Sequence, residues 1–136
     1  MKPQLSALRD FFVVRFDLER KSIVAALAWG GWALVRRSFE SAPGFRFLKI
    51  SAAWFGLAGE TFWGGLLLTG GCLQLLGLLT GRDRLRMFAA MWLSAVWSLI
   101  GLQFFLWNSR TTGAPTYLIF AWSAGCLYFQ IGTRRR

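Results

Sequence analysis

The sequence predicts an all-α integral membrane protein, and three observations lead to this class. The chain of 136 residues is 55% hydrophobic, with a mean hydropathy of +0.44. Only 16% of its residues are charged, compared with about 25% in a typical soluble domain. The charges cluster in short stretches, separated by segments long enough to cross a bilayer. We therefore expect one membrane domain, residues 1–136, built as a bundle of three to four transmembrane helices with an N-terminal amphipathic interfacial helix.

The amphipathic helix is expected over residues 1–21. Leu5, Leu8, Phe12 and Phe16 recur there at steps of three and four residues, whereas the charged side chains fall largely on other sides. This pattern is typical of a helix that lies in the membrane interface. A helix that packs its apolar stripe against the rest of the protein is the alternative.

The first apolar run, residues 22–35, is short. Its 14 residues reach about 21 Å as a helix, less than the roughly 30 Å of the hydrocarbon core. Lys21 and Arg36 close it on either side. The run spans the bilayer only if these basic residues snorkel or the preceding helix continues it. Otherwise it is a re-entrant or interfacial segment.

A second, longer run extends from Ile50 to Gly81 and holds a single charge, Glu60. Its 32 residues would overshoot the bilayer as one straight helix, and one long tilted helix is the alternative. We favour a bend near Gly59, which gives a short helix followed by a transmembrane helix over 60–81.

Two further transmembrane helices are expected, over 87–107 and 115–132. A tight charged turn, Arg82–Arg86, is predicted before the first, and Pro115 suits the first turn of the second. With four spans, one side of the membrane carries eleven Lys and Arg residues and the other five. The positive-inside rule then places both termini in the cytoplasm, for a multi-pass protein of the inner (cytoplasmic) membrane.

Glu60 is the ionisable residue inside a long apolar run, and such a carboxylate is a candidate functional group because inserting it is unfavourable. With Gln74 and Gln103 it forms the set of candidate pore-lining or buried polar residues. The alternative is that Glu60 begins the 60–81 helix at the headgroup boundary, where the helix dipole favours an acid.

Small residues at four-residue steps predict close helix packing. Gly56 and Gly64 share a spacing with Ala52 and Glu60, and Gly77 and Gly81 form a GxxxG motif. The full set of candidate helix-packing residues is Gly56, Gly64, Gly77, Gly81, Ser94, Ser98 and Gly125. Such faces serve packing within one chain or contacts between copies, and we expect a homo-oligomer.

Eight tryptophans lie partly at segment ends, as in an aromatic belt, whereas Trp97 and Trp122 lie nearer mid-span and are expected to pack between helices. The chain has no histidine, no GxSxG elbow and no P-loop lysine. Cys72 and Cys126 lie in apolar runs and behave as small hydrophobic residues. We expect no catalytic residues, no metal and no cofactor, and the basic segment ends indicate lipid headgroups rather than nucleic acid.

The layout as a whole, several short spans with tight charged turns and a basic tail at Arg134–Arg136, resembles small bacteriophage holins. Glu60-x3-Gly64-Gly65-Leu-Leu-Leu and the later GLLTGRDR are similar to the second span of DoxX-type four-helix membrane proteins. The holin resemblance implies an oligomeric channel or pore. The alternative is a membrane scaffold or accessory subunit that docks a protein partner and forms no pore. An enzyme is not expected.

Overall fold

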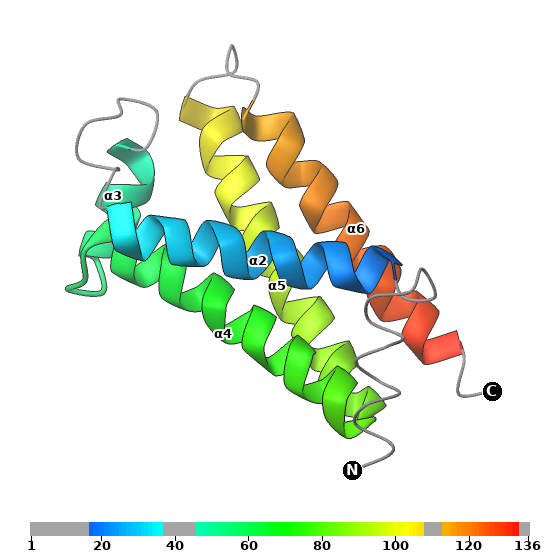
Figure 1. Cartoon of the computed structure of the whole chain (residues 1–136). Coiled ribbons are helices and arrows are strands. Elements are labelled where there is room, and N and C mark those ends of the chain that lie inside the picture. Colours follow the sequence, from blue (N-terminus) through cyan, green and yellow to red (C-terminus); the bar gives the residue numbers. More distant parts are fainter. Residues whose placement is uncertain (1–16, 37–45, 108–112, 134–136) are drawn as a thin grey trace.

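Five helices follow one another in the computed structural model, which describes residues 17–36, 46–107 and 113–133 (Figure 1). Their bounds are α2 Asp17–Arg36, α3 Arg46–Ala53, α4 Gly59–Thr80, α5 Asp83–Trp107 and α6 Gly113–Thr133. The described part of the chain contains no strand, so the predicted all-α class is confirmed. Residues 1–16 of the expected amphipathic helix lie outside the described residues.

The first apolar run lies within α2, which begins five residues before it, at Asp17. Asp17 and Glu19 occupy the first turn of this helix, where acids interact favourably with the helix dipole. The helix has 20 residues and is therefore about 30 Å long. The preceding residues thus extend the short run to the thickness of a hydrocarbon core.

The second run is interrupted between α3 and α4 by a turn at residues 54–58. Gly56 adopts a left-handed conformation there, with φ of 68°. The expectation that Gly56 lies on one helix face with Ala52, Glu60 and Gly64 is therefore wrong. Ala52 belongs to α3 and Gly56 to the turn, so the four-residue spacing does not continue along a single helix.

The connection between α4 and α5 is shorter than the predicted turn. Gly81 ends α4 in a left-handed conformation, with φ of 66°, and its N–H donates to the carbonyl of Leu78. The Arg82 N–H donates to the carbonyl of Gly77, and α5 begins at Asp83. The turn predicted over residues 82–86 is wrong for its last four residues, because the left-handed glycine reverses the chain at once.

Successive long helices run in opposite directions and pack as neighbours: α2 against α4, α4 against α5, and α5 against α6 (Figure 1). Leu18 at the start of α2 and Met87 near the start of α5 both pack against a buried cluster that includes Leu127 and Ile131 near the end of α6. One end of the bundle therefore collects these helix termini. We call it the charged end, and it holds Asp17, Glu19, Arg20, Lys21, Arg82, Asp83, Arg84 and Arg86.

Glycines set the distance of α4 from both neighbours. A Cβ at Gly64 would lie 3.0 Å from the carbonyl oxygen of Gly30 in α2, and one at Gly71 would lie 2.9 Å from Leu27. A Cβ at Gly70 would lie 2.6 Å from Leu93 in α5. Two separate glycine faces of α4 thus allow α2 and α5 to approach its backbone closely.

An aromatic cluster fills the middle of the bundle. Trp97 of α5 stacks on Tyr117 of α6, with ring centroids 5.8 Å apart, and meets Trp29 of α2 edge to face at 5.8 Å. Trp29 Nε1 donates to the Tyr117 hydroxyl at 3.3 Å. The prediction that Trp97 packs between helices is confirmed. The same prediction for Trp122 is wrong, because its ring is 75% exposed.

Candidate functional site

An ion pair buried at the charged end joins α2 to α5. Arg86 Nε donates to Glu19 Oε1 at 2.9 Å, and Arg86 Nη2 donates to Glu19 Oε2 at 2.6 Å. Arg86 Nη1 donates to Asp83 Oδ1 at 2.8 Å, one helical turn earlier. Glu19 is only 1% exposed. The two-bond geometry is the one in which a guanidinium and a carboxylate attract each other most strongly.

Room for Arg86 comes from Gly77 of α4. A Cβ at Gly77 would lie 2.8 Å from Arg86 Cγ and 3.0 Å from the Arg86 backbone nitrogen. Any larger side chain at this position would displace α5 or push the guanidinium away from Glu19. Gly77 is therefore a packing residue, as predicted from its spacing, and its neighbour is an arginine of the same chain.

A second polar contact, between Ser22 of α2 and Gln74 of α4, lies about one helical turn along α2 from Glu19 of the ion pair. We define the polar cluster as Glu19, Ser22, Gln74, Asp83 and Arg86. The Gln74 side chain is completely buried, and Ser22 Oγ of α2 donates to its Oε1 at 3.3 Å. Among the described residues, none accepts a hydrogen bond from the Gln74 Nε2 group. Ser22 and Glu19 are three residues apart on α2, and Gln74 and Gly77 three residues apart on α4, so the cluster is continuous between the two helices.

The three candidate polar residues predicted from the sequence lie in different places. Glu60 is 6% exposed in the first turn of α4, and Gln74 follows it by fourteen residues, about 21 Å along the helix axis. Gln103 of α5 accepts a hydrogen bond from Ser51 Oγ of α3 at 3.0 Å. Glu60 and Gln74 are thus buried among helices of this chain, Gln103 is half-buried beside α3, and the three do not line one common surface.

The candidate helix-packing residues also lie in different environments, and not all of them contact a neighbouring helix. Gly64 meets α2, and Ser94 Oγ of α5 donates to the carbonyl of Ala121 in α6 at 2.9 Å. A Cβ at Gly125 would lie 3.4 Å from Ser94 Oγ. Gly81 is a helix cap, and a Cβ there would have no neighbour within 4 Å. The interpretation of Gly77 and Gly81 as one GxxxG crossing face is therefore wrong for Gly81.

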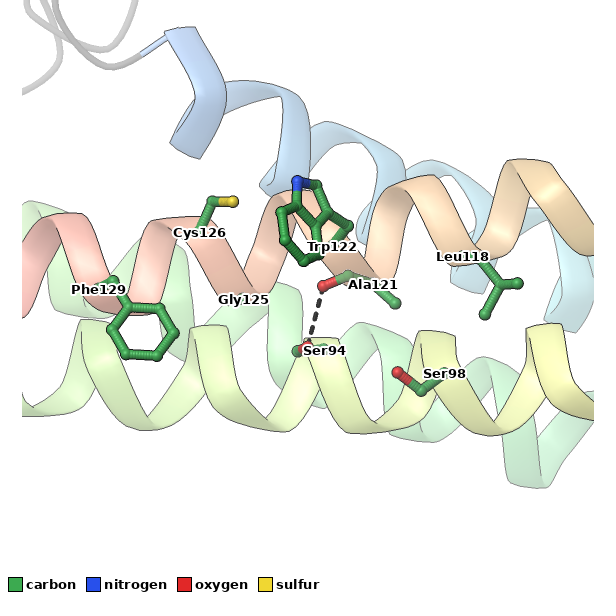
Figure 2. Close-up of a pocket in the computed structure, with 8 residues that line it drawn as sticks. All are labelled: Ser94, Ser98, Leu118, Ala121, Trp122, Gly125, Cys126 and Phe129. Atoms are coloured by element: carbon green, nitrogen blue, oxygen red, sulfur yellow. Dashed lines mark hydrogen bonds between the residues drawn. The ribbon is translucent and has the colours of Figure 1, made fainter.

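An open groove runs between α5 and α6 (Figure 2). It has a volume of about 420 Å³. Ser94 and Ser98 of α5 face Ala121 and Gly125 of α6, and Trp122 projects from α6 beside them (Figure 2). Small residues thus form its floor, and large apolar side chains flank it.

Sequence reasoning missed Glu19 and Arg86, the most deeply buried charged pair among the described residues. Both lie at the ends of apolar runs, where charges ordinarily face headgroups and water. One local signal was present. Arg86 is three residues after Asp83 and directly precedes the apolar run that begins at Met87, a position that favours a stem lying along a packed helix face.

Within the described ranges, no group of three or more His, Cys, Asp or Glu side chains is placed to hold a metal ion. Cys72 and Cys126 are free thiols. Comparisons with protein-family models, with curated proteins and with solved structures found no match. The fold and the polar cluster are therefore the basis for any statement about function.

Proposed function

We propose that the chain is a multi-pass membrane protein in which α2, α4, α5 and α6 each cross the bilayer, and that it acts as a non-pore accessory subunit holding a partner protein through the α5–α6 groove. The observation on which this depends is the distribution of polarity. Glu19, Glu60, Gln74 and Arg86 lie inside the bundle, whereas many large apolar side chains are exposed on its outside.

The outer surface supports the membrane location. Residues such as Val35, Phe105, Leu106, Ile119 and Phe129 are exposed along the long helices. A soluble protein rarely leaves so much contiguous apolar surface in contact with water. Within the bilayer this surface faces lipid, and the buried Glu19–Arg86 pair avoids it.

The length and composition of two helices support two of the four proposed spans. Gly59–Thr80 and Asp83–Leu106 are long and apolar enough to cross a membrane. In each, 44% of the most apolar 18-residue stretch is buried inside the bundle. The core helix of a soluble protein would be mostly buried. The helix α6, with 21 residues, is long enough to cross a hydrocarbon core, and α2 carries charges in its first turns. These charges lie at the charged end, where Asp17, Arg20 and Lys21 can reach the headgroups and Glu19 is paired with Arg86.

The proposed orientation follows from the helix termini and basic residues that lie at the charged end. Four antiparallel spans place the start of α2 and the end of α6 on one side of the membrane, together with the α4–α5 connection. This is the side with the larger number of basic residues, and the positive-inside rule assigns it to the cytoplasm.

The positions of the polar residues favour an accessory subunit over a pore. A group that lines a pore must reach water, but Glu60 is only 6% exposed and Gln74 is completely buried against α2. The α5–α6 groove, by contrast, has the form in which membrane helices associate, with small residues on the floor and bulky ones at the sides. We assign to it an apolar helix of a partner protein.

A holin-like homo-oligomeric pore is the second candidate function. The exposed hydroxyl of Ser98, beside Gly125 in the groove, favours it. Copies that associate there would place a polar group between subunits. The two functions differ in the occupant of the groove and in the effect on the membrane.

Two measurements on one set of cells separate the functions. Expressed at high level, an accessory subunit leaves the membrane potential intact, and capture in mild detergent returns one heterologous partner in fixed stoichiometry. Ser98→Trp, which fills the groove, is expected to lower the recovered partner by about tenfold, equivalent to about 1.4 kcal/mol. Leu99→Trp, the next residue and outside the groove, is the matched control. Collapse of the potential together with ring-shaped homo-oligomers in native lipid would overturn the proposal.

A further inference from the structure

A second pocket lies at the charged end, around the connection between α4 and α5. It is lined by residues 81–85 and Phe88 and has a volume of about 570 Å³. Arg82 and Arg84 both line it, and both side chains are exposed. The short Gly81 turn brings these two arginines to the same opening, two residues apart.

The charges around this pocket are not balanced. Asp83 also lines it, but its carboxylate accepts a hydrogen bond from the buried Arg86 at 2.8 Å. Arg20, which is half-buried, and Lys21, which is exposed, also lie at the charged end, and both pair with Asp17. Among the described residues, Arg82 and Arg84 are in none of the ion pairs, so the pocket has a net positive charge.

One wall of the pocket is apolar and continues into the membrane-facing side of α5. Phe88 is half-exposed, and Met91, Leu99 and Leu102 follow it as exposed side chains at steps compatible with one face of the helix. A molecule with a negative headgroup and a long apolar chain matches this arrangement, in which two arginines lie next to an exposed apolar helix face. A free inorganic anion would use only the arginines.

We propose that this pocket binds the phosphate of an anionic phospholipid, with the guanidinium groups of Arg82 and Arg84 on the phosphate and Phe88 against an acyl chain. Arginine suits this task because its planar donor set matches the oxygens of a phosphate. The inference rests on the proposed membrane location, and it is independent of whether the α5–α6 groove holds a partner.

The test uses the purified full-length chain in a neutral detergent, with phosphatidylglycerol as the probe and phosphatidylcholine as the reference lipid. Native mass spectrometry counts the lipids that stay bound. The double variant Arg82→Gln with Arg84→Gln is expected to weaken phosphatidylglycerol binding by about 30-fold, roughly fivefold for each guanidinium near the membrane surface. Arg20→Gln with Lys21→Gln removes the same charge at the same end and is expected to weaken it by less than about fivefold.

A third variant identifies the source of the phosphate. Phe88→Ala is expected to lower the affinity for phosphatidylglycerol and leave any binding of inorganic phosphate unchanged. Circular dichroism confirms that each variant keeps its helix content. Equal losses in the two double variants would overturn the proposal, because they would indicate diffuse charge. Displacement of phosphatidylglycerol by millimolar inorganic phosphate, or no preference over phosphatidylcholine, would overturn it as well. None of these outcomes depends on partner capture or membrane potential.

Discussion

Arg86 and Glu19 lie 67 residues apart in the sequence and form two hydrogen bonds, at 2.9 Å and 2.6 Å. The pair ties the start of α5 to the start of α2 across the end of α4. Because Gly77 leaves no Cβ in its path, the guanidinium passes α4 and reaches the carboxylate. This contact holds the start of α2 beside the start of α5 at the charged end.

Breaking this pair on one side is expected to destabilise the fold strongly. Arg86→Met leaves the buried carboxylate of Glu19 without its guanidinium, which lowers the free energy of unfolding by about 3 kcal/mol. The double variant Glu19→Leu with Arg86→Met is expected to recover about 1 kcal/mol or more, because no uncompensated charge stays buried. Unfolding by sodium dodecyl sulfate, followed by circular dichroism, measures both. Arg84→Met, at an exposed arginine, is the control, and an equal loss there would contradict the structural role of the pair.

Two adjacent glycines of α4 provide a matched test of helix contact. Gly64→Ala puts a methyl group 3.0 Å from the Gly30 carbonyl oxygen, and we expect a loss of about 1–3 kcal/mol from overpacking. Gly65→Ala enters open space and is expected to raise stability by about 0.5–1 kcal/mol, because alanine favours helix. The same denaturation assay compares them. Similar effects at both positions would show that α2 does not pack on this face.

Because the Gln74 amide nitrogen has no acceptor among the described residues, we predict that a substitution of this buried residue changes stability little. Gln74→Met keeps nearly the same shape and removes a buried donor that has no acceptor. We expect stability to stay within about 1 kcal/mol of wild type, because removal of the unsatisfied donor offsets the loss of the hydrogen bond from Ser22. Gln103→Met removes one of the two acceptors of the Ser51 hydroxyl, the other being the Leu48 carbonyl, and is expected to lower stability by about 0.5–1 kcal/mol. A loss at Gln74 of more than about 2 kcal/mol would contradict the absence of an acceptor for its amide.

The end of α4 depends on a left-handed residue. Gly81→Ala forces a side chain into φ of 66°, and we expect it to lower the free energy of unfolding by about 1 kcal/mol. Gly81→Asn is expected to lower it less, because asparagine tolerates this conformation. Thermal unfolding in detergent ranks the two variants. If both behaved like wild type, the tight α4–α5 connection would be wrong.

The helical class was predictable because run length and hydropathy act locally. The glycine-rich run predicted close approach for the same reason, and Gly64 and Gly77 do lie against neighbouring elements. Spacing alone did not distinguish a helical glycine from Gly56 or Gly81, whose backbones are left-handed. A four-residue repeat has meaning only where the helix is unbroken, and a glycine can itself be the break.

The polar cluster was less accessible to sequence reasoning. Glu19 and Arg86 resemble ordinary end-of-span charges until α2 is placed beside α5. The partners of Gln74 and Gln103 also come from other helices, 52 residues away in each case. Pairing at such separations depends on how the helices pack, and no periodicity within one segment contains that information.

Site-directed labelling of single cysteines tests membrane residence and orientation most directly. In a Cys126→Ala background, native Cys72 is an exposed residue in the middle of α4, and Arg84→Cys and Ala58→Cys add thiols at opposite ends of the bundle. With a membrane-impermeant maleimide and intact spheroplasts, we predict that Ala58→Cys reacts, that Arg84→Cys reacts only after permeabilisation, and that Cys72 reacts only in detergent. Reaction of Cys72 without detergent, or reaction of both end positions from the same side, would contradict a four-span bundle embedded in the membrane.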